Sequence, residues 1–321
     1  MIEKYKNKII CGDALEKLKE LPSESIDCVI TSPPYFNLRD YGVDGQIGME
    51  KTHQEYIKKL IDIFSEVKRI LKKEGTCFVN LGDTYNSSPI GHQVDKLREK
   101  SYQFKKNQDK NISTKSLMLI PERFVIAMID NGWILRNKLV WVKPNAMPES
   151  VQDRWKKAHE YIFFFVKSKK YFFNLDAIRT LHKDISIKRA EYEQGRNALG
   201  LNPSSMGEKY KKNKSAMYGM PARQVKLNPL GAVPPDYLVV NTNCSEQDTS
   251  LEHYATYPQR LIAPLIRAGC PGKGIVLDPF FGSGTTGLVA KKLGRSFVGI
   301  ELSPEYIKIA EKRLSQNNLV I

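Results

Sequence analysis

The stretch VLDPFFGSGTTGLVA, residues 276–290, constrains the fold more than any other part of the chain. A short apolar run ends in an acid, a glycine-rich turn follows, and helix-forming residues come next. Gly282 and Gly284 let the backbone come close to a ligand at positions where a Cβ would intrude. This order is typical of open α/β sheets, which bind nucleotides at the carboxyl ends of their strands.

The rest of the chain alternates short apolar runs with amphipathic segments. Residues 54–73 place apolar side chains on one face at helical spacing, which predicts a long helix ended by Gly75. Because the expected strands are apolar throughout, we predict an α/β sheet covered by helices on both faces. The other expected helices are 14–21, 120–132, 257–269, 285–294 and 303–314, and the expected strands are 8–13, 26–31, 76–81, 133–142, 160–167, 274–280 and 296–302.

The second constraining stretch, TSPPYFNLRDYG, covers residues 31–42 and directly follows an expected buried strand. Each proline fixes its own φ, removes a backbone donor and restricts the residue before it. The result is a stiff loop that holds Ser32, the neighbouring carbonyls and Tyr35 in fixed places at the edge of a sheet.

Two acids mark the ends of neighbouring expected strands, Asp278 and, about twenty residues later, Glu301. Glu301 is at a position that suits the hydroxyls of a ribose, and Asp278 is at a position that suits a cationic amine. The glycine pattern is not GxGxxG and no GK[ST] follows it, so binding of a pyrophosphate or of ATP is disfavoured. S-adenosylmethionine has an amine and a ribose but no phosphate, and it fits this pattern.

The net charge is +15, with 50 Lys and Arg against 35 Asp and Glu, which favours a polyanionic partner. Residues 91–116 hold seven basic and three acidic side chains, and residues 181–230 hold ten and four, without helical or strand periodicity. Each stretch is either a solvated surface loop or a segment that follows phosphates and orders on nucleic acid.

DPFFGSGTT and TSPPY together resemble the motifs of the DNA amino-methyltransferases, and their order resembles the permuted beta class of that family. The resemblance implies a Rossmann-like methyltransferase sheet, S-adenosyl-L-methionine as cofactor and double-stranded DNA as substrate. It divides the chain into a catalytic part, 1–180, with a mobile basic loop at about 85–116, a target-recognition insert, 181–235, and a cofactor-binding part, 236–321.

The family's chemistry explains the rigid loop. An exocyclic amine is a poor nucleophile because its lone pair is delocalised into the base. If the Ser32 hydroxyl and the Pro33 carbonyl accept its two N–H groups, the lone pair can turn toward the methyl group, with Pro34 keeping these acceptors in place. Tyr35 can stack on the target base, which must be flipped out of the duplex.

The resemblance carries over further residues to the cofactor and to DNA. Asp13 either accepts from the cofactor adenine or caps a helix, and Phe280 either packs on the cofactor or belongs to the core. Trp141 and Lys143 either border the base pocket or are a core tryptophan and a surface lysine. The full cofactor set is Asp13, Thr31, Asp278, Phe280, Gly282, Gly284, Thr285 and Glu301, with Thr286 as a further candidate, and the DNA set is Lys143, Lys209, Lys211, Lys212, Lys214 and Arg223.

Ser32 favours cytosine N4 as the methylated atom, since Ser usually opens this motif in cytosine-N4 enzymes and Asp or Asn in adenine-N6 enzymes. Both amines present the same pair of donors, so adenine N6 stays open. More distant alternatives are an RNA or a protein-glutamine methyltransferase with an xPPY loop. Partners implied by the class are a second copy of the chain and a cognate restriction endonuclease encoded nearby.

The amino-terminal stretch MIEKYKNKIICGD predicts no signal peptide, and no apolar run reaches the length of a membrane span. The five cysteines form no CxxC pair, which predicts reduced thiols and no metal site. We therefore expect a cytoplasmic protein, associated with the nucleoid through DNA.

Overall fold

The chain divides into two compact units, one made of Met1–Asn174 with Pro235–Ile321 and the other of Leu175–Pro234. The computed structural model describes residues 2–86, 90–95, 100–105, 108–188, 190, 227–242 and 257–316.

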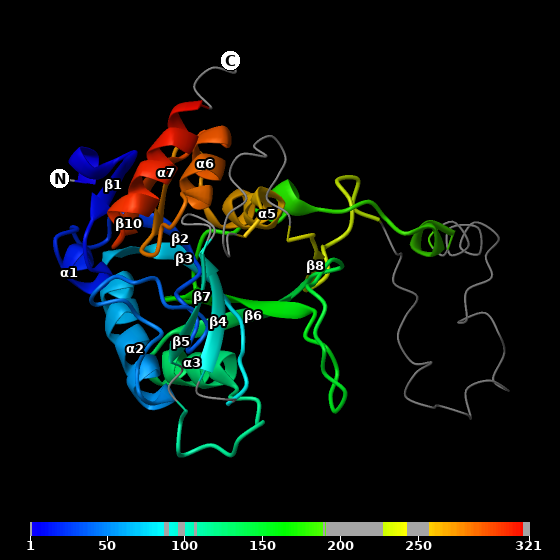
Figure 1. The fold of residues 1–321 in the computed structure, drawn as a ribbon. Helices are drawn as coiled ribbons and strands as arrows, with labels where there is room; N and C mark the ends of the chain where they lie inside the picture. Colours follow the sequence, from blue (N-terminus) through cyan, green and yellow to red (C-terminus); the bar gives the residue numbers. More distant parts are fainter. Residues whose placement is uncertain are drawn as a thin grey trace, which may run out of the picture. The chain divides into compact units, whose positions relative to one another are not determined.

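The larger unit is built around a sheet of eight strands in the described part of the chain (Figure 1). The strand order is β1-β10-β9-β2-β3-β7-β6-β8, and neighbours run parallel except for the two pairs that include β7. The strands are β1 Lys8–Cys11, β2 Ile26–Thr31, β3 Leu71–Leu81, β6 Ile134–Val142, β7 His159–Val166, β8 Tyr237–Val239, β9 Ile275–Asp278 and β10 Ser296–Glu301.

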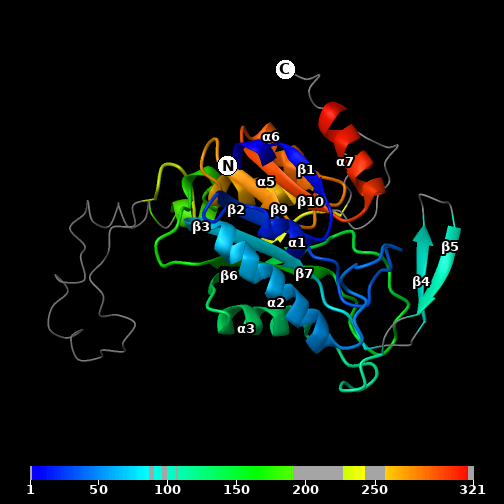
Figure 2. The same cartoon turned by 90° about the vertical axis from the view of Figure 1, so that its left-hand side faces the viewer.

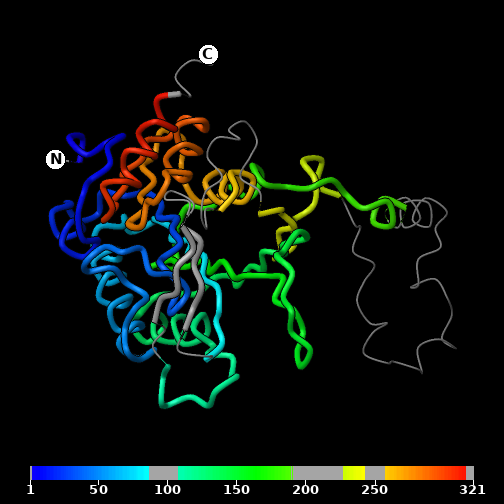
Figure 3. Tube along the Cα trace, viewed as in Figure 1, coloured from blue at the N-terminus to red at the C-terminus, as the bar shows by residue number. Residues whose placement is uncertain are grey.

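The two ends of the chain meet inside this sheet. β1 pairs with β10, and β2 pairs with β9, so strands from the first 31 residues lie beside strands from the last fifty (Figure 3). The register sets Cys28 opposite Val276 and Val29 opposite Leu277. Because parallel strands end at the same edge of a sheet, Thr31 and Asp278 come together although 247 positions separate them.

Helices cover both faces of the sheet, as the apolar strands predict (Figure 2). Successive strand residues point to opposite faces, so Val29 joins the core under one set of helices and Cys28 and Ile30 the core under the other. One face is covered by α1 Ala14–Lys19, α2 His53–Ile70 and α3 Ile120–Asp130, and the other by α5 Gln259–Gly269, α6 Thr285–Lys292 and α7 Pro304–Gln316.

The long helix α2 shows how the sequence produces this packing. Its buried residues recur at helical spacing, and its first turn is capped by the Thr52 hydroxyl, which accepts from the Glu55 amide. Leu60, Phe64 and Val67 are fully buried, and each contributes roughly 1.5–3 kcal/mol relative to an exposed side chain.

Three features differ from the sequence expectations. The helix expected over 54–73 ends at Ile70, because Leu71 is buried and pairs with Ile26 of β2. The basic stretch expected to be irregular contains an antiparallel pair, β4 Ile90–Asp95 and β5 Lys100–Lys105, whose sequences are too polar to show an apolar alternation. The short edge strand β8 was not expected at all.

The smaller unit begins with a 3-10 turn, Asp176–Ile178, and its two ends are held together. The amide of Thr180 donates to the carbonyl of Ala232 (3.1 Å), and the amide of Ala232 donates back to Thr180 (2.8 Å). Gly231, at φ 109°, packs so closely on Thr180 that a Cβ there would lie 2.3 Å from its carbonyl oxygen. This antiparallel bridge joins the first and last segments of the unit.

Candidate functional site

The candidate site lies at the edge of the sheet where β2, β9 and β10 end. Thr31 is the last residue of β2, Asp278 of β9 and Glu301 of β10, and the three strands are neighbours. Two loops leave the sheet at this edge. The catalytic loop is residues 31–35, TSPPY, and the cofactor loop is residues 278–286, DPFFGSGTT.

Asp278 joins the two loops. Its side chain is buried, at 1% exposure, and its two oxygens accept four hydrogen bonds, about as many as a carboxylate can accept. Burial raises the pKa of Asp278, and these donors act against the rise. The donors are the hydroxyls of Thr31 (2.6 Å), Thr286 (2.6 Å) and Tyr257 (2.9 Å) and the amide of Phe280 (3.1 Å).

Asp278 therefore has a structural role, termed bracing here: its carboxylate holds the two loops together, because protein groups already occupy its acceptor positions. Contact between its carboxylate and the cofactor amine stays a prediction. Tyr257 was not singled out from the sequence. Its hydroxyl contacts both Asp278 and Thr286, and burial raises its pKa well above the usual value, so it acts as a neutral donor.

Glu301 is placed differently. Its two oxygens accept one backbone amide each, from Gly282 (2.7 Å) and from Ser303 (2.8 Å). The side chain is half-buried, and burial raises the pKa of Glu301. Since a carboxylate offers about four lone-pair positions, Glu301 retains acceptor capacity for a ligand hydroxyl.

The glycines of the cofactor loop serve two purposes. Both have positive φ, 51° at Gly282 and 81° at Gly284. A Cβ on Gly282 would meet no atom closer than 4.0 Å, so this side of the loop is open, as expected for a backbone that a ligand approaches. A Cβ on Gly284 would lie 3.0 Å from Ala310 of α7, so packing inside the protein also requires a glycine there, and contact between Gly284 and the cofactor stays a prediction.

The adjacent phenylalanines of the cofactor loop separate in the fold. Phe281 is buried and stacks on Phe297 of β10, with ring centroids 5.4 Å apart. Phe280 is half-buried beside the other core, at the edge where the strands end. Phe281 is therefore the core residue of the pair, and Phe280 is the one that can contact a ligand.

The catalytic loop is fixed by contacts from distant elements. Pro33 is buried, and the Pro34 carbonyl accepts a hydrogen bond from Tyr56 of α2 (2.8 Å). The Ser32 side chain is half-buried and its hydroxyl donates to the Tyr35 hydroxyl at 3.4 Å. With the Pro34 carbonyl engaged by α2, the Pro33 carbonyl remains the predicted acceptor of this loop.

Tyr35 is anchored by two strands that the sequence did not connect with it. Its hydroxyl donates to Glu160 Oε2 (2.8 Å), and Asn80 Oδ1 lies 3.1 Å away as a second acceptor. Asn80 Nδ2 also donates to Glu160 Oε2 (3.1 Å). Burial raises the pKa of Tyr35 well above its usual value, so the phenol stays protonated. Only the folded sheet, which pairs β3 with β7, brings Asn80 and Glu160 together.

Of the alternative interpretations for Trp141 and Lys143, the structure supports the core position of Trp141 but not the surface position of Lys143. Trp141 is a core residue, 4% exposed, with its indole nitrogen donating to the Val240 carbonyl (2.8 Å). Lys143 is not a solvated surface lysine, because its side chain is 16% exposed and forms an ion pair with Glu160. Its ammonium also lies 4.2 Å from the centre of the Trp141 ring, a cation–π distance.

The remaining predicted residues fall into three groups. Asp13 caps α1, where its carboxylate accepts from the Glu16 amide (3.1 Å), so the capping interpretation is the one with a contact. Thr285 accepts from the Arg313 guanidinium of α7 (3.2 Å), which holds the cofactor loop on that helix. The other predicted DNA contacts lie outside the described residues: Lys209, Lys211, Lys212, Lys214 and Arg223.

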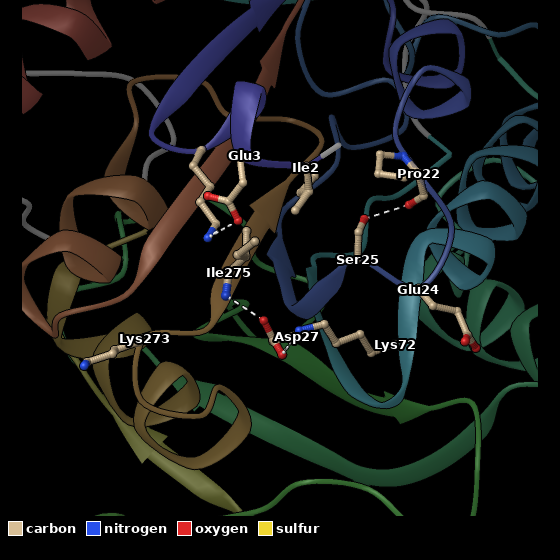
Figure 4. Close-up of a pocket in the computed structure, with 10 residues that line it drawn as sticks. Ile2, Glu3, Pro22, Glu24, Ser25, Asp27, Lys72, Lys273 and Ile275 are labelled. Atoms are coloured by element: carbon tan, nitrogen blue, oxygen red, sulfur yellow. Dashed lines mark hydrogen bonds and ion pairs between the residues drawn. The ribbon is translucent and has the colours of Figure 1, made fainter.

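A surface hollow of about 380 Å³ lies far from these groups, at the amino ends of β2 and β9 (Figure 4). Asp27 bridges it by pairing with Lys72 (2.7 Å) and accepting from the Ile275 amide (2.8 Å). These contacts join two strands and account for the acid there. Among the described residues, no cluster of His, Cys, Asp and Glu could hold a metal ion, and no helix could cross a membrane.

Comparison with known proteins identifies the family of this chain. Residues 26–312 match the model of the N6/N4 methyltransferase family, described as DNA methylase. The chain belongs to this DNA methylase family. It is similar to the type II methyltransferase M.XycI of Xanthomonas campestris pv. cyanopsidis, at 39% identity over 97% of the chain and 88% of the relative. It is also similar to M.SmaI of Serratia marcescens, at 36% identity over 96% of the chain and 90% of the relative.

Solved structures show the same fold. The PvuII DNA methyltransferase, which is named as cytosine-N4-specific, superposes with a TM-score of 0.64 at 21% identity, covering 98% of this chain and 88% of that one. The M1.HpyAVI complex with SAM superposes with a TM-score of 0.52 at 20% identity, covering 96% of this chain and 98% of that one. The Rossmann-like methyltransferase fold expected for this DNA methylase is confirmed.

Proposed function

We propose that this DNA methylase transfers a methyl group from S-adenosyl-L-methionine to cytosine N4 of a base flipped out of duplex DNA. The observation that carries the proposal is the Ser32 hydroxyl, held in the rigid catalytic loop beside the cofactor loop. The Thr31–Asp278 hydrogen bond fixes the two loops to each other at the start of the catalytic one. The cytosine-N4 specificity of the PvuII methyltransferase, which shares the fold, supports the choice of base.

Glu301 and the residues of the cofactor loop fit S-adenosyl-L-methionine. The spare lone pairs of Glu301 suit ribose hydroxyls, the open side of Gly282 admits a ligand against the backbone, and Phe280 offers an aromatic surface. When bound, this cofactor supplies an electrophilic methyl group on a sulfonium. The absence of a Walker-type sequence agrees with a ligand that lacks phosphates.

The catalytic loop activates the amine by accepting its hydrogens. The Ser32 hydroxyl and the Pro33 carbonyl are aligned before the base arrives, because the two prolines and the Tyr56 contact restrict the backbone. Acceptors that need no reorganisation stabilise the charge that develops on the amine nitrogen. The ring of Tyr35 provides the stacking surface for the flipped base.

DNA contacts are proposed for both units. In the smaller unit, residues 181–235 form the target-recognition insert, with Lys209, Lys211, Lys212, Lys214 and Arg223 facing phosphates. In the larger unit, the β6–β7 connection presents Trp155, 92% exposed, between basic neighbours. Exposed aromatic rings flanked by cations are typical of surfaces that bind nucleic acid.

The wider roles follow from the relatives. Because M.XycI and M.SmaI are named type II methyltransferases, we propose a restriction–modification role with a cognate endonuclease encoded nearby. We also propose that the protein acts in the cytoplasm, on nucleoid DNA, and that two copies form a dimer.

The choice of base is tested by the methylated nucleosides in DNA. DNA from cells that express the protein, and from cells that express the Ser32→Ala variant, is digested and its nucleosides are separated by mass spectrometry. We expect N4-methylcytosine in the first sample and a strong reduction in the second. Detection of N6-methyladenine alone would show that the enzyme methylates adenine N6 instead of cytosine N4. Unmodified DNA with methylated RNA or protein would overturn DNA as the substrate.

The insert is tested by the salt dependence of DNA binding. Each phosphate contact adds about 0.9 to the slope of log K against log salt on duplex DNA. Replacing Lys209, Lys211, Lys212 and Lys214 by Ala should therefore lower the slope by up to about 3.6 and weaken binding to every sequence alike. A slope equal to that of the unchanged protein would show that these lysines do not contact phosphates.

A further inference from the structure

A chain of hydrogen bonds leads from the catalytic hydroxyl into the sheet. The Ser32 hydroxyl donates to the Tyr35 hydroxyl (3.4 Å), which donates to Glu160 Oε2 (2.8 Å). Glu160 belongs to β7 and lies 125 residues from Tyr35 in the sequence. We propose that Glu160 is a positioning residue, which sets the direction of this chain so that the Ser32 oxygen faces the target amine as an acceptor.

The direction follows from what each group can do. An ionised carboxylate only accepts, whereas a hydroxyl has one proton to donate and lone pairs to accept with. Tyr35 must therefore donate to Glu160, and its oxygen is left to accept from Ser32. The single proton of Ser32 is then directed toward Tyr35, and the lone pairs of Ser32 are available to accept one N–H group of the amine, while the Pro33 carbonyl accepts the other.

Two neighbours keep Glu160 in this role. Lys143 pairs with Glu160 Oε1, which balances the negative charge and leaves Oε2 for the chain. Asn80 donates from Nδ2 both to Glu160 Oε2 (3.1 Å) and to the Tyr161 carbonyl (3.1 Å), which fixes the orientation of its amide. Its oxygen consequently faces the Tyr35 hydroxyl as a second acceptor, 3.1 Å away.

Within the described part of the chain, the partners of the Tyr35 hydroxyl other than Ser32 are thus acceptors. If the carboxylate were an amide, Lys143 would claim its one oxygen, and an NH₂ group would face Tyr35. Tyr35 would then donate to Asn80 Oδ1 alone, and the new NH₂ group would compete with Ser32 as a donor to the Tyr35 oxygen. The Ser32 proton would be free to point at the amine, where it repels the N–H donors. The inference rests on the proposed function but not on the base, since cytosine and adenine present the same pair of N–H donors.

The test compares Glu160→Gln, Tyr35→Phe and the double variant in single-turnover methylation of a duplex at saturating cofactor and DNA. Tyr35→Phe keeps the stacking ring and removes only the hydroxyl. We expect each single variant to lose roughly 10–10²-fold in rate, below the effect of deleting a direct transition-state hydrogen bond, with little change in the Kd of either ligand. Glu122→Gln is the matched control, because it breaks an exposed ion pair with Lys138 (2.6 Å), and its rate should not change.

The double variant distinguishes positioning from a structural role. If Glu160 acts only through the Tyr35 hydroxyl, the double variant should be no slower than Tyr35→Phe alone, because nothing is left to orient. Losses that multiply would overturn the proposal, and so would a Glu160→Gln rate equal to that of the unchanged protein. If Glu160→Gln fails to fold, Tyr35→Phe still tests the proposal. An unchanged methylation rate in Tyr35→Phe would show that the hydrogen-bond chain through Tyr35 does not orient Ser32. Failure of the proposed function looks different, because the unchanged protein would then methylate no base.

Discussion

The catalytic loop, 31–35, and the cofactor loop, 278–286, leave neighbouring strands at the same edge but are held in different ways. The cofactor loop is fixed by its own glycines, by Tyr257, Glu301 and Arg313, each within 30 positions of its partner in the loop, and by one distant hydroxyl, that of Thr31. The catalytic loop depends on side chains from α2, β3 and β7. A turn that binds a ligand through its backbone can be built locally, whereas a hydroxyl that must point one way needs support from afar.

The two loops nevertheless share one connection. Thr31 immediately precedes Ser32, and its hydroxyl donates to Asp278 in the cofactor loop. Any change at this connection should disturb both loops, whereas a change farther along either loop should disturb only one. The following predictions use this difference.

The largest effect is expected at Ser32. Ser32→Ala removes one of two preorganised acceptors and leaves the backbone of the loop intact, so the single-turnover rate should fall roughly 10²–10³-fold. Cofactor affinity, measured by titration, should hardly change, because the proposed cofactor site lies mainly on the other loop. Ser315→Ala, at an exposed position of α7, should leave both quantities unchanged. A full rate in Ser32→Ala would leave the Pro33 carbonyl as the only acceptor.

Asp278→Ala should affect both loops through the shared connection. It leaves three buried hydroxyls and one amide without their acceptor, and each such group costs about 1–3 kcal/mol. We expect the free energy of unfolding to fall by about 3 kcal/mol or more in denaturant titrations. Asp13→Ala, which removes a helix cap, should cost about 1 kcal/mol. Equal losses in the two variants would contradict the bracing role of Asp278.

Glu301→Ala should affect the cofactor loop alone. Its carboxylate binds two backbone amides and retains lone pairs for ribose hydroxyls, so its removal should weaken cofactor binding by about 1–3 kcal/mol. The control is Glu311→Ala, at an exposed position of α7, for which titration should give the original affinity. An unchanged cofactor affinity in Glu301→Ala would show that Glu301 does not bind the ribose.

The smallest effect concerns the strands beneath the loops. Cys28 of β2, Cys77 of β3 and Cys270 after α5 are buried, and burial raises the pKa of all three thiols, to about 12 for Cys270. At pH 8 only roughly 10⁻⁴ of such a thiol is ionised, so it should resist alkylation, whereas the exposed Cys11 should react. Mass spectrometry of the labelled protein measures this. In Asp278→Ala, labelling of Cys28 should accelerate, and an unchanged rate would show that the strand below the catalytic loop is not loosened.

The sequence alone determined the order of strands and helices and the two loops at their ends. Apolar runs and helical spacing are local signals, and so is a pair of prolines or a glycine turn, so these features could be predicted without a fold. The same signals misplaced the end of α2, because the pairing of Leu71 with β2 overrides the helical pattern. They also missed β4 and β5, whose polar strands show no apolar alternation.

Only the tertiary structure decided which side chains serve the loops. Tyr257, Asn80 and Glu160 carry no sequence motif that links them to the site, and their contacts arise because β2 lies between β9 and β3, with β7 next to β3. The fold also places Asp278 where its carboxylate joins the two loops, and Lys143 where it forms an ion pair with Glu160. The reason is physical, because burial makes a polar group dependent on its partners, and those partners are chosen by the pairing of strands far apart in the chain.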